Sequence, residues 1–137
     1  MIILEGTAAV GKTSTIEKLK EYNIQDRDKY ISRYMDIDIS LQERAKLYYD
    51  YITKQDNVIL FLINMDKKEL ERRISLRNTV DKYDKLAYLY NLLYFETYIY
   101  MEKYNMLDNK LFMVDVTGLT IDKQTSKIKS LIDKINR

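Results

Sequence analysis

The segment Gly6-Thr7-Ala8-Ala9-Val10-Gly11-Lys12-Thr13 has residue types and spacings suited to holding a polyphosphate. The two glycines let the backbone turn tightly, so that its N–H groups can point toward an anion at the start of a helix. Lys12 would contact the β- and γ-phosphates of ATP, and the hydroxyl of Thr13 would bind Mg²⁺. The segment therefore predicts a phosphate-binding loop with ATP and Mg²⁺ as cofactors, held by Gly6, Thr7, Ala8, Ala9, Val10, Gly11, Lys12, Thr13 and Ser14.

Two further groups of charged residues have spacings that suit phosphoryl transfer. Asp26 could hold Mg²⁺ or orient an acceptor hydroxyl and Arg27 could bind a phosphate, although a solvated turn gives the same pattern; Asp28 is the alternative carboxylate. Arg73 and Arg77 lie one helical turn apart, as is needed to lay two guanidinium groups across a polyphosphate, unless they are ordinary surface arginines. The predicted catalytic residues are Lys12, Asp26, Arg27, Arg73 and Arg77, and the predicted metal ligands are Thr13 and Asp26.

Composition narrows the chemistry that the chain can support. The 137 residues include no cysteine and no histidine. A disulfide framework, a thiolate or imidazole metal site and a Ser-His-Asp arrangement are therefore excluded, which leaves Asp, Glu, Lys, Arg and bound Mg²⁺. The net charge of +2 gives no general attraction to nucleic acid or anionic membrane. The longest apolar run, Val58 to Ile63, is too short to span a bilayer.

Strand and helix patterns alternate along the chain. Apolar runs predict strands at Ile2–Leu4, 58–63 and 111–114, with a further short strand within 23–30. Helical periodicity and N-cap patterns predict helices at about 13–22, 40–54, from Asp66 onward, 83–104 and 120–135. Strands that alternate with helices indicate a parallel sheet with its ligand at the carboxyl ends of the strands. The sequence thus predicts one domain, 1–137, with a three-layer α/β/α architecture.

Four segments occur in an order typical of one group of enzymes. They are Leu4-Glu5-Gly6 at the loop entry, Asp26-Arg27 with Tyr30-Ile31-Ser32, Leu60 to Asp66 with Glu71, Arg73, Ile74 and Arg77, and Leu111 to Thr117. In these segments the chain resembles the P-loop kinases of deoxynucleosides and nucleoside monophosphates, the thymidylate kinase and deoxynucleoside kinase group. The resemblance implies a P-loop NTPase fold with a parallel sheet of about four to five strands. It also implies that the loop after the last strand, here with Thr117, lies against the adenine.

The chain departs from that family in two places. Where relatives have a second strand and a substrate-binding helix before the Asp-Arg motif, only Asn23 to Gln25 are present, so the acceptor pocket is reduced or built elsewhere. Ala9 stands where the family usually has glycine. If this residue takes a positive φ, the alanine costs about 1 kcal/mol.

Three functional hypotheses follow. The first is an ATP- and Mg²⁺-dependent kinase that phosphorylates a nucleoside or nucleoside monophosphate. The second is a 5′-hydroxyl polynucleotide kinase, which needs no deep nucleoside pocket and is the hypothesis under which nucleic acid is a partner. The third is a reduced, non-catalytic relative that acts through protein contacts, for which the shortened acceptor region is the argument.

The predicted helix 83–104 is rich in tyrosine and apolar nearly all round. Such a helix favours core packing plus a partner surface over stacking on bases, and the resemblance also implies a homodimer. No membrane partner is expected. The absence of cysteine and of a visible signal peptide favours a cytoplasmic location. A composition rich in Lys, Asn, Ile and Tyr is typical of AT-rich genomes, which suggests a viral protein acting in the host cytoplasm.

Overall fold

The fold was analysed in a computed structural model that describes residues 1–26, 38–77 and 82–137. Its centre is a four-stranded parallel sheet in the order β2-β1-β3-β4. The strands are β1 (Ile2–Gly6), β2 (Gln25–Asp26), β3 (Val58–Ile63) and β4 (Leu111–Asp115). The chain is thus an α/β protein with a small parallel sheet.

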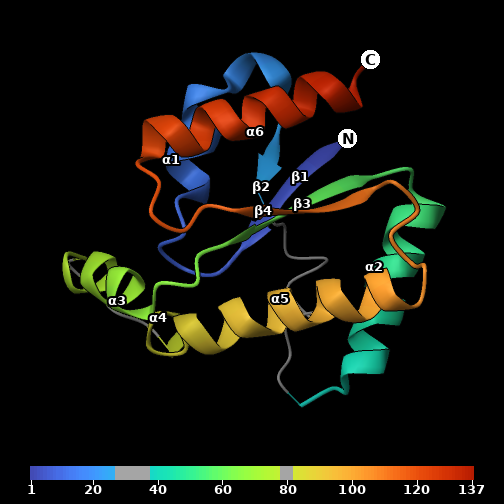
Figure 1. Cartoon of the computed structure of the whole chain (residues 1–137), viewed down its shortest axis with the longest axis horizontal. Coiled ribbons are helices and arrows are strands. Elements are labelled where there is room, and N and C mark those ends of the chain that lie inside the picture. Colours follow the sequence, from blue (N-terminus) through green and yellow to red (C-terminus); the bar gives the residue numbers. More distant parts are fainter. Residues whose placement is uncertain (27–37, 78–81) are drawn as a thin grey trace.

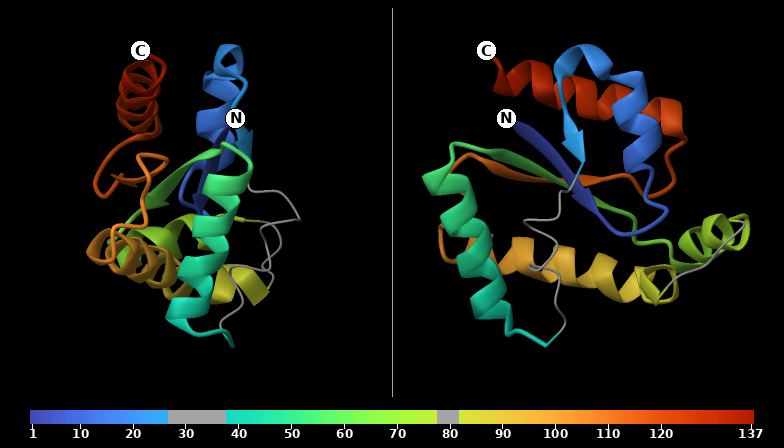
Figure 2. Two further views of the ribbon diagram at one scale, coloured as in Figure 1. Left: turned by 90° about the vertical axis from the view of Figure 1, so that its right-hand side faces the viewer. Right: turned by 180° about the vertical axis from the view of Figure 1, so that it is seen from behind.

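Helices cover both faces of this sheet (Figures 1 and 2). On one face lie α1 (Lys12–Lys18) and α6 (Ile121–Ile135), and on the other lie α2 (Leu41–Lys54) and α5 (Ala87–Lys103). The shorter helices α3 (Lys67–Ser75) and α4 (Lys82–Lys85) follow β3 and lie to one side. This arrangement is compatible with the predicted three-layer architecture.

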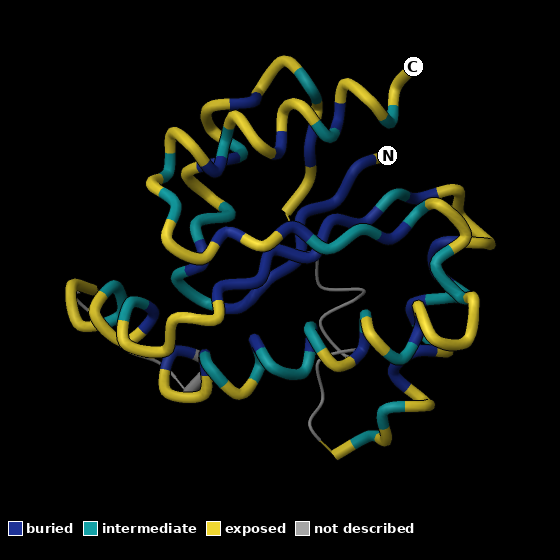
Figure 3. The backbone as a smooth tube through the Cα atoms, viewed as in Figure 1, coloured by how far each residue is buried: buried dark blue, intermediate teal, exposed yellow. Residues whose placement is uncertain are grey.

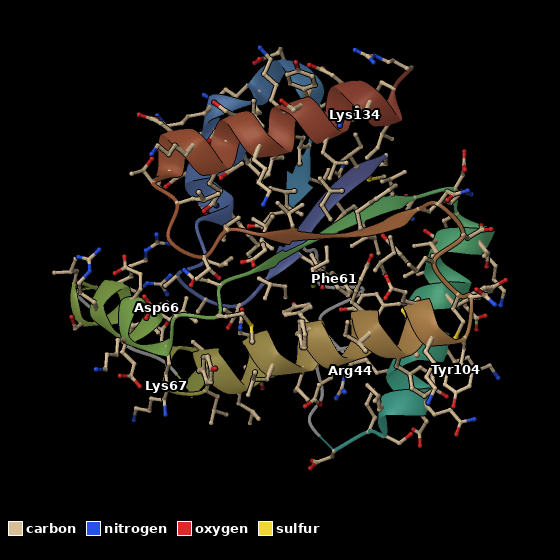
Figure 4. All side chains as sticks on the ribbon, viewed as in Figure 1. Arg44, Phe61, Asp66, Lys67, Tyr104 and Lys134 are labelled. Carbon is tan, nitrogen blue, oxygen red and sulfur yellow. The ribbon has the colours of Figure 1, made fainter. Side chains whose placement is uncertain are left out.

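The strands β1 and β3 bury side chains on both faces, as their continuous apolar sequences predict. In β3, Ile59, Phe61 and Ile63 face α2 and α5, whereas Leu60 and Leu62 face α1 and α6. Phe61 lies between the sheet and α5, with its ring centroid 5.1 Å from that of Tyr94 (Figure 4). Burial therefore concentrates on the strands and on the inner faces of the helices (Figure 3).

The N-caps predicted at Ser40 and Asp66 are confirmed, and Thr120 caps a third helix. The side-chain oxygens of Ser40, Asp66 and Thr120 accept from the backbone N–H groups three residues later, at 3.1, 3.0 and 3.2 Å. Each bond satisfies one of the N–H groups that a helix leaves without a partner at its start. Asp66 is therefore a helix cap, as expected from its spacing to Glu69.

Three predicted elements have different bounds. The helix predicted over 13–22 ends at Lys18, because Leu19 leaves helical geometry with φ of −120° and ψ of 36°. A 3₁₀ turn, Lys20–Tyr22, follows and ends at Asn23, which takes φ of 50°. The helix predicted over 83–104 is interrupted at Leu86, whose ψ of 14° separates α4 from α5. The strand predicted within 23–30 comprises Gln25–Asp26, and 27–30 lie outside the described residues.

The tyrosines of α5 pack mainly inward. Tyr94 is fully buried, Tyr90, Tyr98 and Tyr100 pack against the same core, and Tyr104 is exposed. The prediction of core packing is therefore confirmed for this helix. Among the described residues, no helix combines the length and the apolar character that crossing a membrane requires.

Candidate functional site

The loop 6–13 connects β1 to α1 and requires glycine at Gly6 and Gly11 for steric reasons. A Cβ atom on Gly6 would lie 2.8 Å from Val10 Cγ1 and 3.1 Å from the carbonyl oxygen of Leu62. Gly11 precedes α1 with φ of 97°, and a Cβ atom there would lie 2.7 Å from Gln124 Nε2. The loop therefore fits tightly between β3 and α6, and a larger residue at either position would move it.

The backbone of the loop leaves a group of N–H donors available. Those of Ala8, Ala9, Gly11, Thr13 and Ser14 have no hydrogen-bond acceptor among the described residues. They belong to a tight turn and to the first turn of a helix, where such groups can bind an anion together with the helix dipole. Ala9 takes φ of 66°, so an alanine occupies the left-handed conformation that usually favours glycine.

Lys12 and Asp26 come together beside the loop. Lys12 Nζ donates to the carbonyl oxygen of Gly6 at 2.8 Å and lies 3.7 Å from Asp26 Oδ1. The pairing of β2 with β1 causes this, because it places Asp26 opposite Leu4, close to the start of the loop. Thr13 and Asp26 are both exposed, so a hydroxyl and a carboxylate oxygen, the hard donors that Mg²⁺ prefers, lie at the same end of the sheet.

Arginines of α3 face the loop from across the cleft. Arg73 Nη1 donates to the carbonyl oxygen of Ala9 at 3.1 Å, and its Nε donates to Glu69 Oε1 at 3.0 Å. Arg72 binds both oxygens of Glu69, at 2.9 and 2.7 Å, and its side chain is 60% exposed. Hydrogen bonds from Arg72 and then Arg73 lower the pKa of Glu69 from 4.5 to about 2.

Arg77 lies at the same cleft but is held differently from Arg73. Its guanidinium forms an ion pair with Asp84 of α4, whose side chain is only 4% exposed. The structure thus brings Arg73 to the loop, while Arg77 joins the end of α3 to α4. Both residues were predicted from the same helical spacing, which gives no information about the partner of each side chain.

A cleft of about 870 Å³ lies between these groups. This volume is within the usual range of about 300–1,000 Å³ for small-molecule sites. Four cations and three carboxylates line it together with the loop and the turn after β4. The lining residues are Thr7 to Ser14, Asp26, Asp66, Glu69, Arg72, Arg73, Arg77 and Gly118 to Ile121.

Of the predicted site residues that the structure describes, Gly6 and Thr117 are not part of this lining. Arg27 falls outside the described residues, as does its alternative neighbour Asp28. Thr117 does not border the cleft: its Oγ1 donates to Asp115 Oδ1 at 2.6 Å and accepts from the backbone N–H of Met65 at 2.8 Å. Asp115 thus holds the turn after β4, whose next residues, Gly118 to Ile121, reach the cleft.

Two buried polar residues near the site were not among the predicted site residues. Gln124 of α6 is fully buried and donates to the loop, and Glu5 of β1 is fully buried and accepts from the hydroxyl of Tyr48 at 2.7 Å. The sequence did contain a signal for Gln124. It stands three residues after Ile121 and four before Ile128, so it occupies a position on the apolar face of the helix.

No protein-family model matches the sequence, and a search of the curated proteins likewise found no match.

Proposed function

We propose that this protein is an ATP- and Mg²⁺-dependent kinase that transfers the γ-phosphoryl group to a nucleoside or a nucleoside monophosphate. The observation that carries the proposal is the loop 6–13 with its available N–H groups, facing Arg73 across the cleft. Phosphoryl transfer requires mainly the positioning of two reactants and the neutralisation of charge on the phosphoryl oxygens. Backbone N–H groups, Lys12 and Arg73 supply these functions without histidine.

Each residue has a specific role in this proposal. The loop N–H groups and Lys12 bind the phosphates, and Arg73 approaches the transferred group from the opposite wall. Thr13 and Asp26 would hold Mg²⁺, which would supply positive charge to neutralise the phosphate oxygens. In this proposal Asp26 would also accept a hydrogen bond from an acceptor hydroxyl. That hydroxyl oxygen forms a bond to the γ-phosphorus, ADP leaves, and the hydroxyl proton passes to Asp26 or to solvent.

A second candidate, a 5′-hydroxyl polynucleotide kinase, is favoured by the short connection between α1 and β2. Between Lys18 and Asp26 there is only a 3₁₀ turn, Lys20–Tyr22, and the two-residue strand β2. This leaves no substrate-binding helix at the place where a nucleoside kinase of the resembled family has one. The end of β2 lies at an open cleft. An open cleft suits a polynucleotide end better than an enclosed nucleoside pocket would.

One acceptor panel separates the candidates. The protein is incubated with γ-labelled ATP and Mg²⁺ and offered deoxynucleosides, deoxynucleoside monophosphates and a 5′-hydroxyl oligonucleotide. Label on a nucleoside or monophosphate supports the first candidate, and label on the oligonucleotide supports the second. Binding of ATP without transfer to any acceptor would reject both and favour a non-catalytic relative.

A variant of the loop lysine tests whether any transfer depends on this site. Lys12→Ala removes the charge beside the loop, so the labelled product should disappear. Lys18→Ala is the matched control, because Lys18 lies on the same helix and pairs with Asp122 at 2.6 Å, away from the cleft. Full activity of Lys12→Ala would show that the loop does not bind the phosphoryl donor.

A homodimer through the tyrosine-rich helix is a further part of the proposal. On and beside α5, Leu86, Leu89 and Ile99 are 37, 41 and 42% exposed and leave apolar side chains at the surface. Burial of such side chains in a second copy would stabilise a dimer. Analytical ultracentrifugation should then show a dimer that Leu89→Glu converts to monomer, and a monomeric wild type would refute this part.

A further inference from the structure

We infer that Gln124 is a positioning residue for phosphate binding, because it holds the Val10–Gly11 peptide in the orientation that presents the N–H of Gly11 to the ligand. The inference rests on the proposed function. It assigns a role in the site to Gln124 of α6. This residue is 114 positions from Val10 in the chain. This residue does not itself contact the ligand.

The side-chain amide of Gln124 joins two parts of the loop region. Nε2 donates to the carbonyl oxygen of Val10 at 3.0 Å and to Thr15 Oγ1 at 3.1 Å. A primary amide nitrogen carries two hydrogens, so both are used in these two bonds. Gln124 is fully buried, and solvent cannot replace either bond.

The bond to Val10 fixes the direction of the neighbouring N–H. In a trans peptide the C=O of one residue and the N–H of the next point in opposite directions. Because the carbonyl of Val10 points to Gln124, the N–H of Gly11 points away from Gln124. That N–H has no acceptor among the described residues, and Gly11 lines the cleft. The geometry is therefore the one that an anion-binding N–H group requires.

The alternative orientation of the amide is unfavourable. If Oε1 and Nε2 exchanged places, two oxygens would face each other at the carbonyl of Val10. In the present orientation Oε1 is buried without a hydrogen-bond partner among the described residues. A buried unsatisfied oxygen costs free energy, so the contact with the loop is retained at the expense of local stability. This is a feature expected of a residue that serves the site.

Gln124 also shapes the loop by contact. A Cβ atom at Gly11 would lie 2.7 Å from its Nε2 and 3.4 Å from its Cδ. The amide thus packs directly against the backbone that it holds. Gln124 is in the first turn of α6, just after Thr120 and Ile121, which line the cleft. The same helix start therefore contributes both a wall of the cleft and the support of its loop.

Two isosteric substitutions test the inference. Gln124→Met keeps the length of the side chain but removes both donors, and Gln124→Glu places an oxygen against the carbonyl of Val10. We expect either change to raise the Kd for ATP and for inorganic tripolyphosphate by about tenfold or more, measured by titration calorimetry. Tripolyphosphate has no base or sugar, so an equal effect on both ligands locates the defect at the phosphates. The NMR signal of the Gly11 amide should shift in the variants.

A neighbouring buried residue provides the control for a purely structural effect. Ile128 lies one turn further along α6, is fully buried and packs in the apolar core. Its side chain has no group that could form a hydrogen bond to the loop. Ile128→Val should lower the Tm and leave both Kd values within about twofold. Equal weakening by Ile128→Val at a matched loss of Tm would overturn the inference.

The remaining outcomes also decide the question. If the wild type binds both ligands and Gln124→Met binds them equally well, the inference fails while the proposed function stands. If the wild type binds neither ligand, both fail. Where the Gln124 variants do not fold, the side-chain amide signals of Gln124 in the wild type provide the test. They should resist solvent exchange and shift on saturation with tripolyphosphate, and unchanged signals would refute the inference.

Discussion

Arg73 donates a hydrogen bond from Nη1 to the carbonyl oxygen of Ala9 across 3.1 Å, which joins the helix α3 to the loop 6–13. The two residues are 64 positions apart in the chain. Glu69 holds the Nε of the same guanidinium at 3.0 Å, so the side chain is fixed at two points. Within the described residues, the hydrogen bonds of Arg73 use Nε and Nη1, and Arg73 lines the cleft. An arginine held in this way loses little further rotamer freedom when it binds a ligand.

The contact makes Arg73 the arginine of α3 whose loss should affect phosphoryl transfer most. Arg73→Ala should lower kcat/KM by about 100-fold, the usual effect of removing one preorganised donor at a developing charge. The free energy of unfolding should also fall, by about 1 kcal/mol, because the side chain is only 19% exposed and donates hydrogen bonds to Glu69 and Ala9. Arg72→Ala is the matched control, since Arg72 binds Glu69 and makes no hydrogen bond to the loop. Equal losses in the two variants would contradict this assignment.

Arg77 should behave differently from Arg73, because its ion pair with Asp84 has a buried carboxylate on one side. Arg77→Ala removes a charged donor from that carboxylate and should lower the free energy of unfolding by about 1–3 kcal/mol. Urea denaturation measures this change. Arg77→Lys keeps the charge and should recover part of the loss. If Arg77→Ala is as stable as the wild type, the ion pair does not hold α4 in place.

The strands and capped helices of this fold could be predicted from local patterns. The continuous run 58–63 indicates a doubly covered strand, and the spacing of Ser40 to Glu43 indicates a helix start, because each depends on neighbouring residues alone. The partner of a side chain depends on tertiary contacts. Arg73 and Arg77 have the same spacing and type, yet one binds the loop and the other binds α4.

Residues that support the site were harder to predict than residues that line it. The loop 6–13 has a recognisable sequence because its backbone must turn tightly, which restricts the residue types. Gln124 is constrained by its hydrogen bonds to Val10 and Thr15, which are far away in the sequence. The interruption at Leu86 similarly has no glycine or proline to mark it, so the helical periodicity appeared continuous from 83 to 104.

The positive φ of Ala9 predicts that glycine would stabilise the protein. A left-handed alanine costs about 1–2 kcal/mol, and the greater entropy of glycine in the unfolded chain offsets about 0.5–1 kcal/mol of this. Ala9→Gly should therefore raise the free energy of unfolding by about 0.5–1 kcal/mol. Chemical denaturation at constant pH provides the measurement. An unchanged or lower stability would show that contacts of the Ala9 methyl group outweigh the backbone strain.

Gly118 provides the reverse experiment. Its φ is 74°, and a Cβ atom there would have no heavy atom within 4 Å. Gly118→Ala thus introduces the same backbone strain without a steric clash and should lower the free energy of unfolding by about 1 kcal/mol. If Ala9→Gly raises the free energy of unfolding and Gly118→Ala lowers it, both changes are explained by the strain of an alanine at positive φ.

The low pKa of Glu69 predicts a specific pH dependence of stability. Its pKa falls from 4.5 in the unfolded chain to about 2 in the folded protein because Arg72 and Arg73 bind the carboxylate. A carboxylate with a depressed pKa stabilises the fold fully above its unfolded pKa, and this contribution is lost as the pH falls toward the folded pKa. Wild type and Glu69→Gln should thus differ by a constant amount above about pH 5 and converge between 4.5 and 2.

A matched carboxylate on the same helix controls for general acid effects. Glu71 is exposed and forms no ion pair within the described part of the chain, so Glu71→Gln should follow the wild type throughout this pH range. Urea unfolding of the three proteins at several pH values between 7 and 2 gives the comparison. If the difference between wild type and Glu69→Gln is as large at pH 3 as at pH 7, the arginines do not hold the ionised carboxylate in solution. Arg73 would then lack the second contact that fixes its guanidinium toward Ala9.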